Sequence, residues 1–152
     1  MKWKRPPITK IYEALGTVAD GRVKVSGNDG QVYSSSGNKY YTIEFDGKNS
    51  IMANDNASYW KGYLGYPAIA FLMSKGVLSY SDEIGGLLKG VMWKDINQKF
   101  KNNFEKALEY ILSSKTKAQK RKLDDFVNKI EKEIINLNPS LLGKKVLPPE
   151  GY

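Results

Sequence analysis

Residues 40–45, Tyr-Tyr-Thr-Ile-Glu-Phe, constrain the fold of this chain more than any other stretch. Their second, fourth and sixth side chains share one face of an extended chain, and those side chains are Tyr, Ile and Phe. The pair Asp46-Gly47 that follows is a tight-turn signal, which leads into a second short segment at residues 50–53. This alternation predicts a half-buried strand of an antiparallel sheet.

Two more strands are expected before residue 40. Val23 and Val25 alternate with polar residues, and the Asn-Asp-Gly sequence at 28–30 predicts a turn into a partner strand around residues 31–34. A serine-rich turn then connects that partner to residues 40–45. Together these segments predict one antiparallel meander of three or four strands.

Apolar residues at helical spacing predict helices in the rest of the chain. Pro67 is placed to open a short apolar helix, because proline is tolerated in a first turn where its missing N–H would have no partner. Thr116 and Gln119 have the spacing of a capping box in front of an apolar stripe that runs to Leu137. The expected helices cover residues 8–15, 67–75, 82–89 and 94–113, and a last segment that ends before Pro139.

These elements predict an α+β fold with a small antiparallel sheet of three to four strands, a packed helix from a ββα unit and a C-terminal helical hairpin. We expect one cooperative domain overall, because 152 residues suffice for one ordinary domain. Within it, residues 1–92 form the sheet-containing region and residues 93–138 form an amphipathic helical hairpin packed on it. Residues 139–152 form an extended C-terminal tail.

The chain contains no cysteine and no histidine. Their absence removes disulfides, thiolate nucleophiles, the imidazole base, and the sulfur and imidazole ligands of metals. The acidic residues lie mostly in predicted turns or helix starts, where capping accounts for them, and Asn54-Asp55-Asn56 is most simply a turn. We therefore expect a protein that is not an enzyme and that uses no metal or cofactor.

The longest apolar run, residues 67–73, is far shorter than the ~20 residues of a membrane-spanning helix. The first residues of the chain also lack the apolar core of a signal peptide. These features predict a cytoplasmic protein with no membrane partner.

The net charge of +8 and the pI of about 9.5 favour a polyanionic partner such as nucleic acid. Basic residues surround Trp3, aromatic residues interleave with a lysine at residues 59–66, and a basic run occupies residues 115–122. Rings between cations can stack on bases while the cations hold phosphates. The candidate nucleic-acid contacts are Lys2, Lys4, Arg5, Tyr59, Trp60, Lys61, Lys115, Lys117, Lys120, Arg121 and Lys122.

Each of these groups also has a structural interpretation. Trp3 can pack on the body of the protein, and the rings at residues 59–66 can cover the strand and helix beside them. The basic run at residues 115–122 can be a solvated helix end, diluted by Asp124 and Asp125. The sequence leaves these alternatives open and supports no specific reading of bases.

Residues 32–73 contain a sequence of motifs in a distinctive order. A Val-Tyr-Ser-Ser-Ser-Gly turn at 32–37 precedes the strand at 40–45, then Ile-Met-Ala-Asn-Asp follows at 51–55, and a Gly-Tyr-Pro sequence opens an apolar helix at 65–72. This order resembles the SWIM zinc finger, a ββα module whose ligands follow Cys-x-Cys and then Cys-x-His. The scaffold of that family is matched, whereas its ligands are missing.

The resemblance implies that four apolar residues occupy the positions of the zinc ligands. Ile51 and Ala53 stand at the positions of the first two cysteines, and Ala68 and Ala70 at those of the last cysteine and the histidine. Aliphatic groups in place of the ligands would avoid burying unpaired polar atoms, so these residues are expected in the core. Because SWIM modules are associated with binding DNA or proteins, the resemblance implies a zinc-independent binding module.

The leading interpretation is therefore a non-enzymatic binding module that contacts nucleic acid non-specifically through basic and aromatic surface residues. The alternative is a protein–protein adaptor or a homodimerising structural protein that uses the C-terminal helices, through the stripe from Leu123 to Leu137, or the aromatic loop. Salt-dependent binding of oligonucleotides would favour the first, and self-association with increasing concentration would favour the second.

Overall fold

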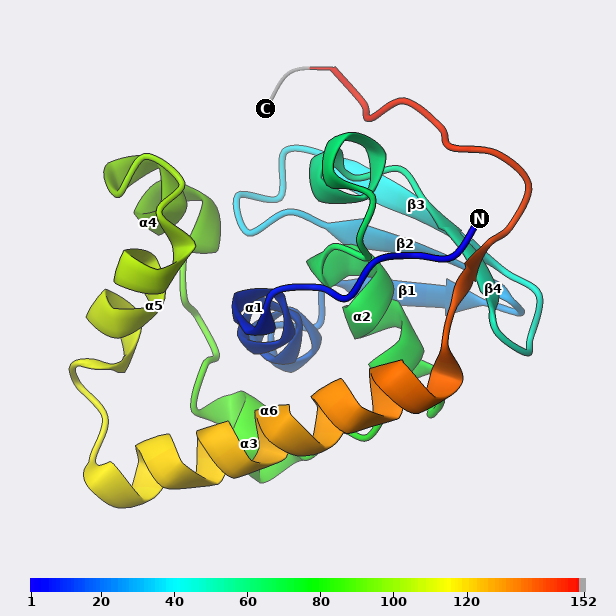
Figure 1. Cartoon of the computed structure of the whole chain (residues 1–152). Helices are drawn as coiled ribbons and strands as arrows, with labels where there is room; N and C mark the ends of the chain where they lie inside the picture. Colours follow the sequence, from blue (N-terminus) through cyan, green and yellow to red (C-terminus); the bar gives the residue numbers. More distant parts are fainter. Residues whose placement is uncertain (151–152) are drawn as a thin grey trace.

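A five-stranded sheet and seven helices make up the computed structural model, which describes residues 1–150 (Figure 1). The α+β class predicted from the sequence is confirmed. Within the described residues, no helix is both long enough and apolar enough to cross a membrane.

The sheet is a meander of four antiparallel strands plus a short fifth strand that runs parallel to the fourth. Strand order in the sheet is the order in the chain, so the first and fifth strands are its edges. The third strand has the predicted alternation, because Tyr41, Ile43 and Phe45 are buried while Glu44 is exposed. The strands are β1 (Val23–Ser26), β2 (Asp29–Tyr33), β3 (Tyr40–Phe45), β4 (Ser50–Ala53) and β5 (Ser140–Leu141).

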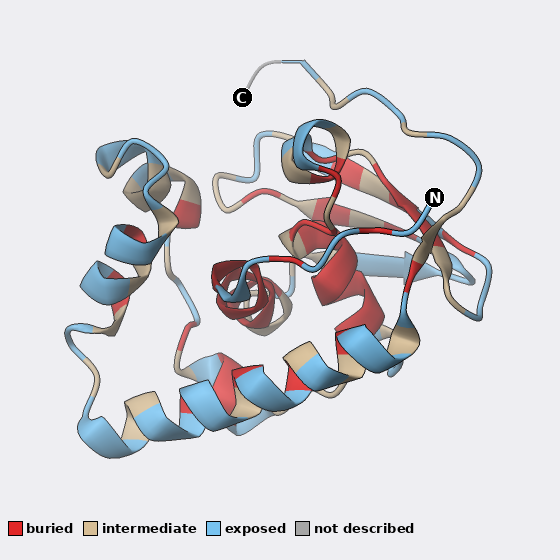
Figure 2. Cartoon of the chain, in the orientation of Figure 1, coloured by how far each residue is buried: buried red, intermediate tan, exposed pale blue. Residues whose placement is uncertain are grey.

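One helix, α1, occupies the centre of the molecule. All of its residues from Thr9 to Thr17 are buried, and it packs against α2, α3, α5 and α6 (Figure 2). Helix α2 packs against α1 and against strands β1 to β4, so it lies between α1 and the sheet. The helices are α1 (Ile8–Ala19), the π-helical turn η1 (Ala57–Lys61), α2 (Tyr66–Ser74), α3 (Asp82–Gly86), α4 (Trp93–Lys99), α5 (Phe104–Leu112) and α6 (Lys117–Leu137).

The single helix predicted over residues 94–113 is wrong, because the chain breaks between α4 and α5. Lys101 and Asn102 have φ angles of 53° and 62°, in the left-handed region that stops a right-handed helix. Asn103 then begins the new helix by accepting a hydrogen bond from the Lys106 N–H at 3.2 Å. The Asn-Asn pair is a capping signal that the regular apolar spacing across it concealed.

Helix α6 begins with the predicted capping box. The Thr116 hydroxyl accepts from the Gln119 N–H at 3.1 Å, and the Gln119 side chain accepts from the Thr116 N–H at 3.0 Å. The buried face of α6 consists of Leu123, Val127, Ile130 and Ile134 and packs on α1 and α3. The apolar stripe of α6 is thus buried against other helices of the same chain.

The first residues of the chain and the segment that follows α6 meet at one edge of the sheet. Ser140 and Leu141, in the segment predicted as an extended tail, pair with β4 as strand β5. Trp3 is buried there, its indole N–H donating to the Ile51 carbonyl at 2.9 Å and its backbone N–H to the Pro139 carbonyl at 3.0 Å. A two-residue strand carries no alternation, so sequence spacing could not indicate it.

The four positions that the SWIM resemblance assigns to lost ligands lie in β4 and α2. Ile51, Ala53, Ala68 and Ala70 are all buried members of the hydrophobic core. Strands β3 and β4 and helix α2 follow one another in the order of a ββα unit, with η1 inserted before the helix. The relation to the SWIM family itself stays a prediction.

Candidate functional site

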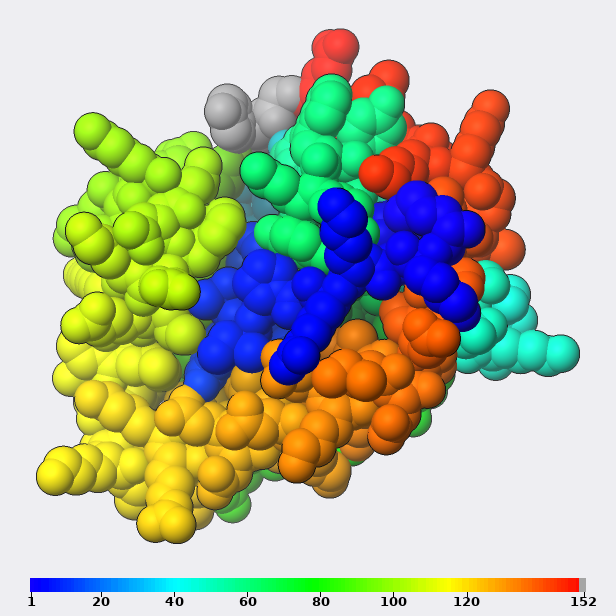
Figure 3. Space-filling view, in the orientation of Figure 1, coloured from blue at the N-terminus to red at the C-terminus, as the bar shows by residue number. Residues whose placement is uncertain are grey.

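A cleft with a volume of about 620 Å³ opens between α1, the η1 segment and the pair of helices α4 and α5, which we call the arm (residues 93–112). In Figure 3 the arm lies to the left of the blue surface of α1, and the η1 segment lies above that surface. Small-molecule sites in proteins typically have volumes of about 300–1,000 Å³, so the cleft is large enough for a ligand. Its lining is rich in lysine, aromatic and amide side chains.

The floor of the cleft contains a buried pair of opposite charges from α1. Lys10 and Glu13 lie one helical turn apart, with side chains only 8% and 9% exposed, and their charged atoms are 3.8 Å apart. The Lys10 ammonium also lies 3.8 Å from the centre of the Phe104 ring at the start of α5. This contact connects the arm to the central helix at the cleft.

Asp55 is the second buried carboxylate of the cleft. It is 4% exposed and accepts hydrogen bonds from the Ser58 N–H at 3.2 Å and the Ser58 hydroxyl at 2.6 Å. The Ser58 hydroxyl in turn accepts from the Gly65 N–H at 3.1 Å. A Cβ atom at Gly65 would stand 1.9 Å from an Asp55 carboxylate oxygen, so this approach requires glycine. The turn predicted around Asp55 therefore exists as a buried network that anchors η1 to the start of α2.

Burial raises the pKa of both carboxyl groups. For Glu13 the nearby charges of Lys10 and Arg22 oppose the rise and that of Asp55 adds to it. For Asp55 the hydrogen bonds from Ser58 and the charge of Lys10 oppose it. The floor of the cleft is thus a place where ionised carboxylates are costly and where hydrogen-bond donors are favoured.

Three tyrosines of the cleft respond to the same charges. Burial raises the pKa of Tyr41, Tyr63 and Tyr66, and the negative charges of Asp55 and Glu13 raise each of them further. Their hydroxyl groups therefore stay protonated at neutral pH and act as neutral donors or acceptors. The rings of Tyr41 and Tyr66 meet edge to face with centres 6.3 Å apart, which fixes the wall that they form.

The mouth of the cleft is basic and carries an exposed ring. Lys39, Lys61 and Lys94 line it, and Trp60 beside them is 66% exposed. Burial lowers the pKa of Lys39, and the charge of Lys94 lowers it further. The Trp60 ring packs edge-on against Tyr59 with centres 4.7 Å apart. The cleft is therefore positive at its mouth, and its floor holds two carboxyl groups and the Lys10 ammonium.

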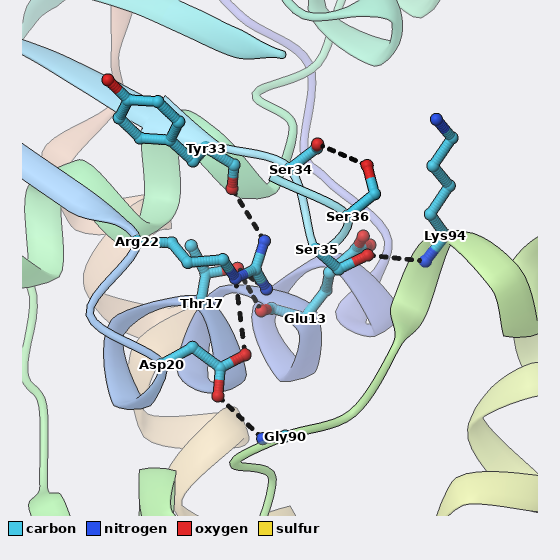
Figure 4. A network of polar contacts seen from close by, with 10 residues as sticks. All are labelled: Glu13, Thr17, Asp20, Arg22, Tyr33, Ser34, Ser35, Ser36, Gly90 and Lys94. Carbon is cyan, nitrogen blue, oxygen red and sulfur yellow. Dashed lines mark hydrogen bonds and ion pairs between the residues drawn. The ribbon is translucent and has the colours of Figure 1, made fainter. Parts of the chain in front are cut away.

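A hydrogen-bond network behind the cleft holds its walls in place (Figure 4). The Arg22 guanidinium donates to the Tyr33 carbonyl at 2.8 Å and to the Thr17 hydroxyl at 3.1 Å, and it lies 3.4 Å from the Asp20 carboxylate. Asp20 accepts from the Gly90 N–H at 2.7 Å. One arginine thus joins the end of α1, the sheet and the segment that leads to the arm.

The arm is attached to the sheet at a second point in the same network. The Lys94 N–H in the first turn of α4 donates to the Ser35 hydroxyl at 3.1 Å, in the turn between β2 and β3. The Ser34 and Ser36 hydroxyls lie 3.0 Å apart and order that turn (Figure 4). The serine-rich turn predicted as a simple connection therefore positions one side of the cleft mouth.

The family described as "Uncharacterised conserved protein UCP014422" matches residues 3–140. The chain belongs to this family. No curated protein and no solved structure matches the chain. The matched range covers the central helix, the four-stranded meander, the arm and α6, so every element of the cleft belongs to the family's common region.

The candidate contacts predicted for this UCP014422 member fall on three separate surfaces. Trp60 and Lys61 line the cleft, and Tyr59 packs against Trp60. The amino-terminal cations lie over the sheet edge and α6, where the Lys2 ammonium donates to the Asn138 carbonyl at 3.0 Å and Arg5 forms an ion pair with Glu131 at 2.8 Å. Lys4 donates its backbone N–H to the Gly62 carbonyl at 2.9 Å.

The remaining predicted contacts lie at the amino end of α6. Lys115, Lys117, Lys120, Arg121 and Lys122 precede or open this helix, at the yellow end of α6 in Figure 3. Lys122 forms an exposed ion pair with Glu83 at 3.1 Å. The structure does not bring this group together with the cleft.

Sequence reasoning missed the interior of the cleft. Lys10 and Glu13 look like the solvent face of a short helix, and Lys39 and Lys94 lie outside every basic run. One signal was available: polar Lys10, Glu13 and Thr17 recur at helical spacing beside a strongly apolar face. Only tertiary packing shows that this polar stripe is covered and not solvated.

Proposed function

We propose that this protein binds single-stranded nucleic acid in the cleft, with the phosphate backbone at the mouth and one base between the aromatic walls. The observation that carries the proposal is that Lys39, Lys61 and Lys94 surround one concave site beside the exposed Trp60. Lysines neutralise phosphates and rings stack on bases, so the contact calls for no metal.

The gathering of cations at the mouth supports an anionic ligand. Lys39 and Lys94 line the same opening, one from the turn before β3 and the other from α4. A phosphate at this opening could accept charge-assisted hydrogen bonds from ammonium groups. Lys61 approaches the cleft from η1.

The shape of the cleft favours a single strand over a duplex. Its volume of about 620 Å³ suits a ligand of nucleotide size. The bases of a duplex are stacked and paired, so one of them could enter only after being flipped out, which costs a few kcal/mol. The bases of a single strand can enter and stack on Trp60 or Tyr63 without that cost.

Fluorescence anisotropy with a labelled single strand of about 12 nucleotides tests this function. We expect binding below about 10 μM at about 50 mM salt and a steep loss of affinity as salt is raised. The triple variant Lys39→Ala, Lys61→Ala and Lys94→Ala should bind at least about tenfold more weakly, because it removes three phosphate partners.

A matched control removes the same charge elsewhere. Lys115→Ala, Lys117→Ala and Lys120→Ala together lower the net charge equally but leave the cleft intact. Equal losses of affinity in the two triple variants would contradict the cleft as the site and leave only general charge attraction. An unmodified protein that binds no oligonucleotide at low salt would refute the function altogether.

Self-association through α6 has less support from the fold. The stripe that would mediate it, including Leu123 and Ile130, is buried against α1 and α3. A dimer through this helix would have to use its outer face. On the described residues of α6, that face exposes one large apolar side chain, Ile135. Light scattering over a range of protein concentrations measures this alternative directly.

A further inference from the structure

The floor of the cleft and its mouth carry opposite charge, and this polarity orients any ligand. Glu13 and Asp55 are buried at the floor, while Lys39, Lys61 and Lys94 surround the opening. An anionic group at the floor would meet two carboxyl groups and one ammonium, that of Lys10, whereas at the mouth it would meet three ammonium groups, so a phosphate belongs at the mouth. The group that points inward must be neutral or a hydrogen-bond donor.

We propose that Glu13 accepts a hydrogen bond from the exocyclic amino group of a nucleobase, so that the cleft prefers amino-bearing bases over uracil and thymine. This inference rests on the proposed binding of single-stranded nucleic acid. It goes beyond that function because stacking and phosphate contacts by themselves would accept every base.

Among the two acids of the floor, Glu13 is the one with unused acceptor capacity. Asp55 already accepts from the Ser58 N–H and hydroxyl. Within residues 1–150, the Glu13 carboxylate pairs with the Lys10 ammonium at 3.8 Å, which is beyond hydrogen-bonding distance. The Glu13 carboxyl group is nine-tenths buried, lines the cleft and accepts no hydrogen bond from the described residues. A ligand that brings a hydrogen-bond donor would satisfy it.

The position of Lys10 leaves the Glu13 carboxylate able to accept a hydrogen bond from a ligand. Its ammonium lies over the Phe104 ring at 3.8 Å as well as 3.8 Å from Glu13, so the cation is shared between a ring and a carboxylate. The aromatic neighbours Tyr41 and Tyr66 form the adjacent wall, which suits a flat heterocycle next to Glu13. A base that stacks on these walls would direct its polar edge to the floor.

Two pyrimidine strands that differ only along one edge of each base provide the test. Cytosine carries an amino group and an unprotonated N3 where uracil carries a carbonyl oxygen and an N3–H, so a deoxycytidine strand and a deoxyuridine strand of about 12 nucleotides present the same charge and length. We expect the deoxycytidine strand to bind about tenfold more tightly, the discrimination typical of a good base-edge contact.

Two substitutions then assign the preference to Glu13. Glu13→Gln keeps a carbonyl oxygen that accepts from the amino group, so it should retain the preference for cytosine. Glu13→Leu fills the same volume without an acceptor, so it should bind both strands with the weaker affinity. Circular dichroism and thermal melting of both variants check that the fold is intact.

The outcomes separate this inference from the function on which it rests. If both strands bind unmodified protein equally, or if Glu13→Leu keeps the preference, the role of Glu13 is wrong while binding of single strands stands. If neither strand binds, the proposed function fails and this inference fails with it. A preference for uracil would also overturn it, because the carboxylate would then be accepting from the uracil N3–H and not from an exocyclic amino group.

Discussion

The protein has two basic surfaces, the mouth of the cleft and the amino end of α6, and they are built in different ways. The lysines of the mouth come from the turn before β3, from η1 and from α4, far apart in the sequence. Those of the α6 end lie within residues 115–122 and share one stretch of chain. The first surface is an assembly of the fold, and the second is a local property of one helix.

Their surroundings differ as much as their origins. The mouth opens onto a cavity of about 620 Å³ that is lined by rings and buried carboxyl groups. The α6 end is fixed by the capping box of Thr116 and Gln119, and its Lys122 already pairs with Glu83. Charge density in a sequence therefore does not locate a binding site, because a site also needs concavity and groups of more than one kind.

The largest expected effect concerns the network that supports the cleft. Gly65→Ala should lower the free energy of unfolding by about 3 kcal/mol, because the new Cβ would overlap an Asp55 oxygen and break its bonds to Ser58. Urea denaturation measures the change. Gly86→Ala in α3 is the control, since a Cβ there meets nothing within 4 Å and should cost nothing. Equal losses would show that the cleft wall is not tightly packed.

A smaller effect is expected in binding and none in folding when the exposed ring is removed. Trp60→Ala should weaken binding of a single strand about tenfold, since base stacking on an aromatic ring is lost. Its free energy of unfolding should change by less than about 0.5 kcal/mol, because the side chain is mostly exposed. Tyr110→Ala, which removes another exposed ring outside the cleft lining, should leave the affinity unchanged.

A substitution at the amino end of α6 should lower stability and leave the affinity for a single strand unchanged. Thr116→Ala should lower the free energy of unfolding by about 1 kcal/mol, because the first turn loses its cap. Thr116→Ser keeps the accepting oxygen and should lose much less. Affinity for a single strand should be the same in both variants; a parallel loss of affinity would mean that the α6 end takes part in binding.

The smallest expected effect is a change in how the free energy of unfolding depends on pH. Glu13 has a raised pKa in the folded protein, so the folded state holds its proton more tightly than the unfolded state. Stability should therefore fall as pH rises from the ordinary carboxyl range, at about pH 4, through the raised pKa of Glu13. Glu13→Gln cannot ionise and should reduce this fall, measured by urea denaturation at a series of pH values.

Asp46, in the turn between β3 and β4, supplies a control with the opposite sign. Backbone N–H groups of Lys48, Ser50 and Asn49 lower the pKa of Asp46 through hydrogen bonds. Its contribution should be present above the ordinary carboxyl range and be lost as pH falls, and Asp46→Asn should remove that loss. If the two variants change the pH profile in the same direction, the burial of Glu13 does not govern its proton.

Much of the fold could be predicted because its signals are local. The alternation in β3, the turn at Asp46-Gly47 and the capping box of Thr116 each depend on residues within a few positions of one another. The break at Asn102 was missed because a helical apolar spacing continues across it and favours one long helix. Strand β5 was missed because its pairing with β4 involves residues 90 positions apart.

The candidate site was predicted only in part, and the reason is burial. Trp60 and Lys61 were candidates because rings beside a cation form a visible pattern. Glu13 gave no such signal, since an acid three residues from a lysine on a helix normally faces water. The packing of the arm and η1 around α1 turns that ordinary pair into the floor of a cleft.

By itself the sequence determined the meander, the Pro-initiated helix α2, the capped helix α6 and the absence of thiol and imidazole chemistry, because each depends on residue types or short-range spacing. Only the tertiary structure decided that α1 is central, that its polar face is enclosed and that lysines from three segments share one opening. Local sequence sets how each segment folds, whereas burial and electrostatics at a site depend on which segments pack against one another.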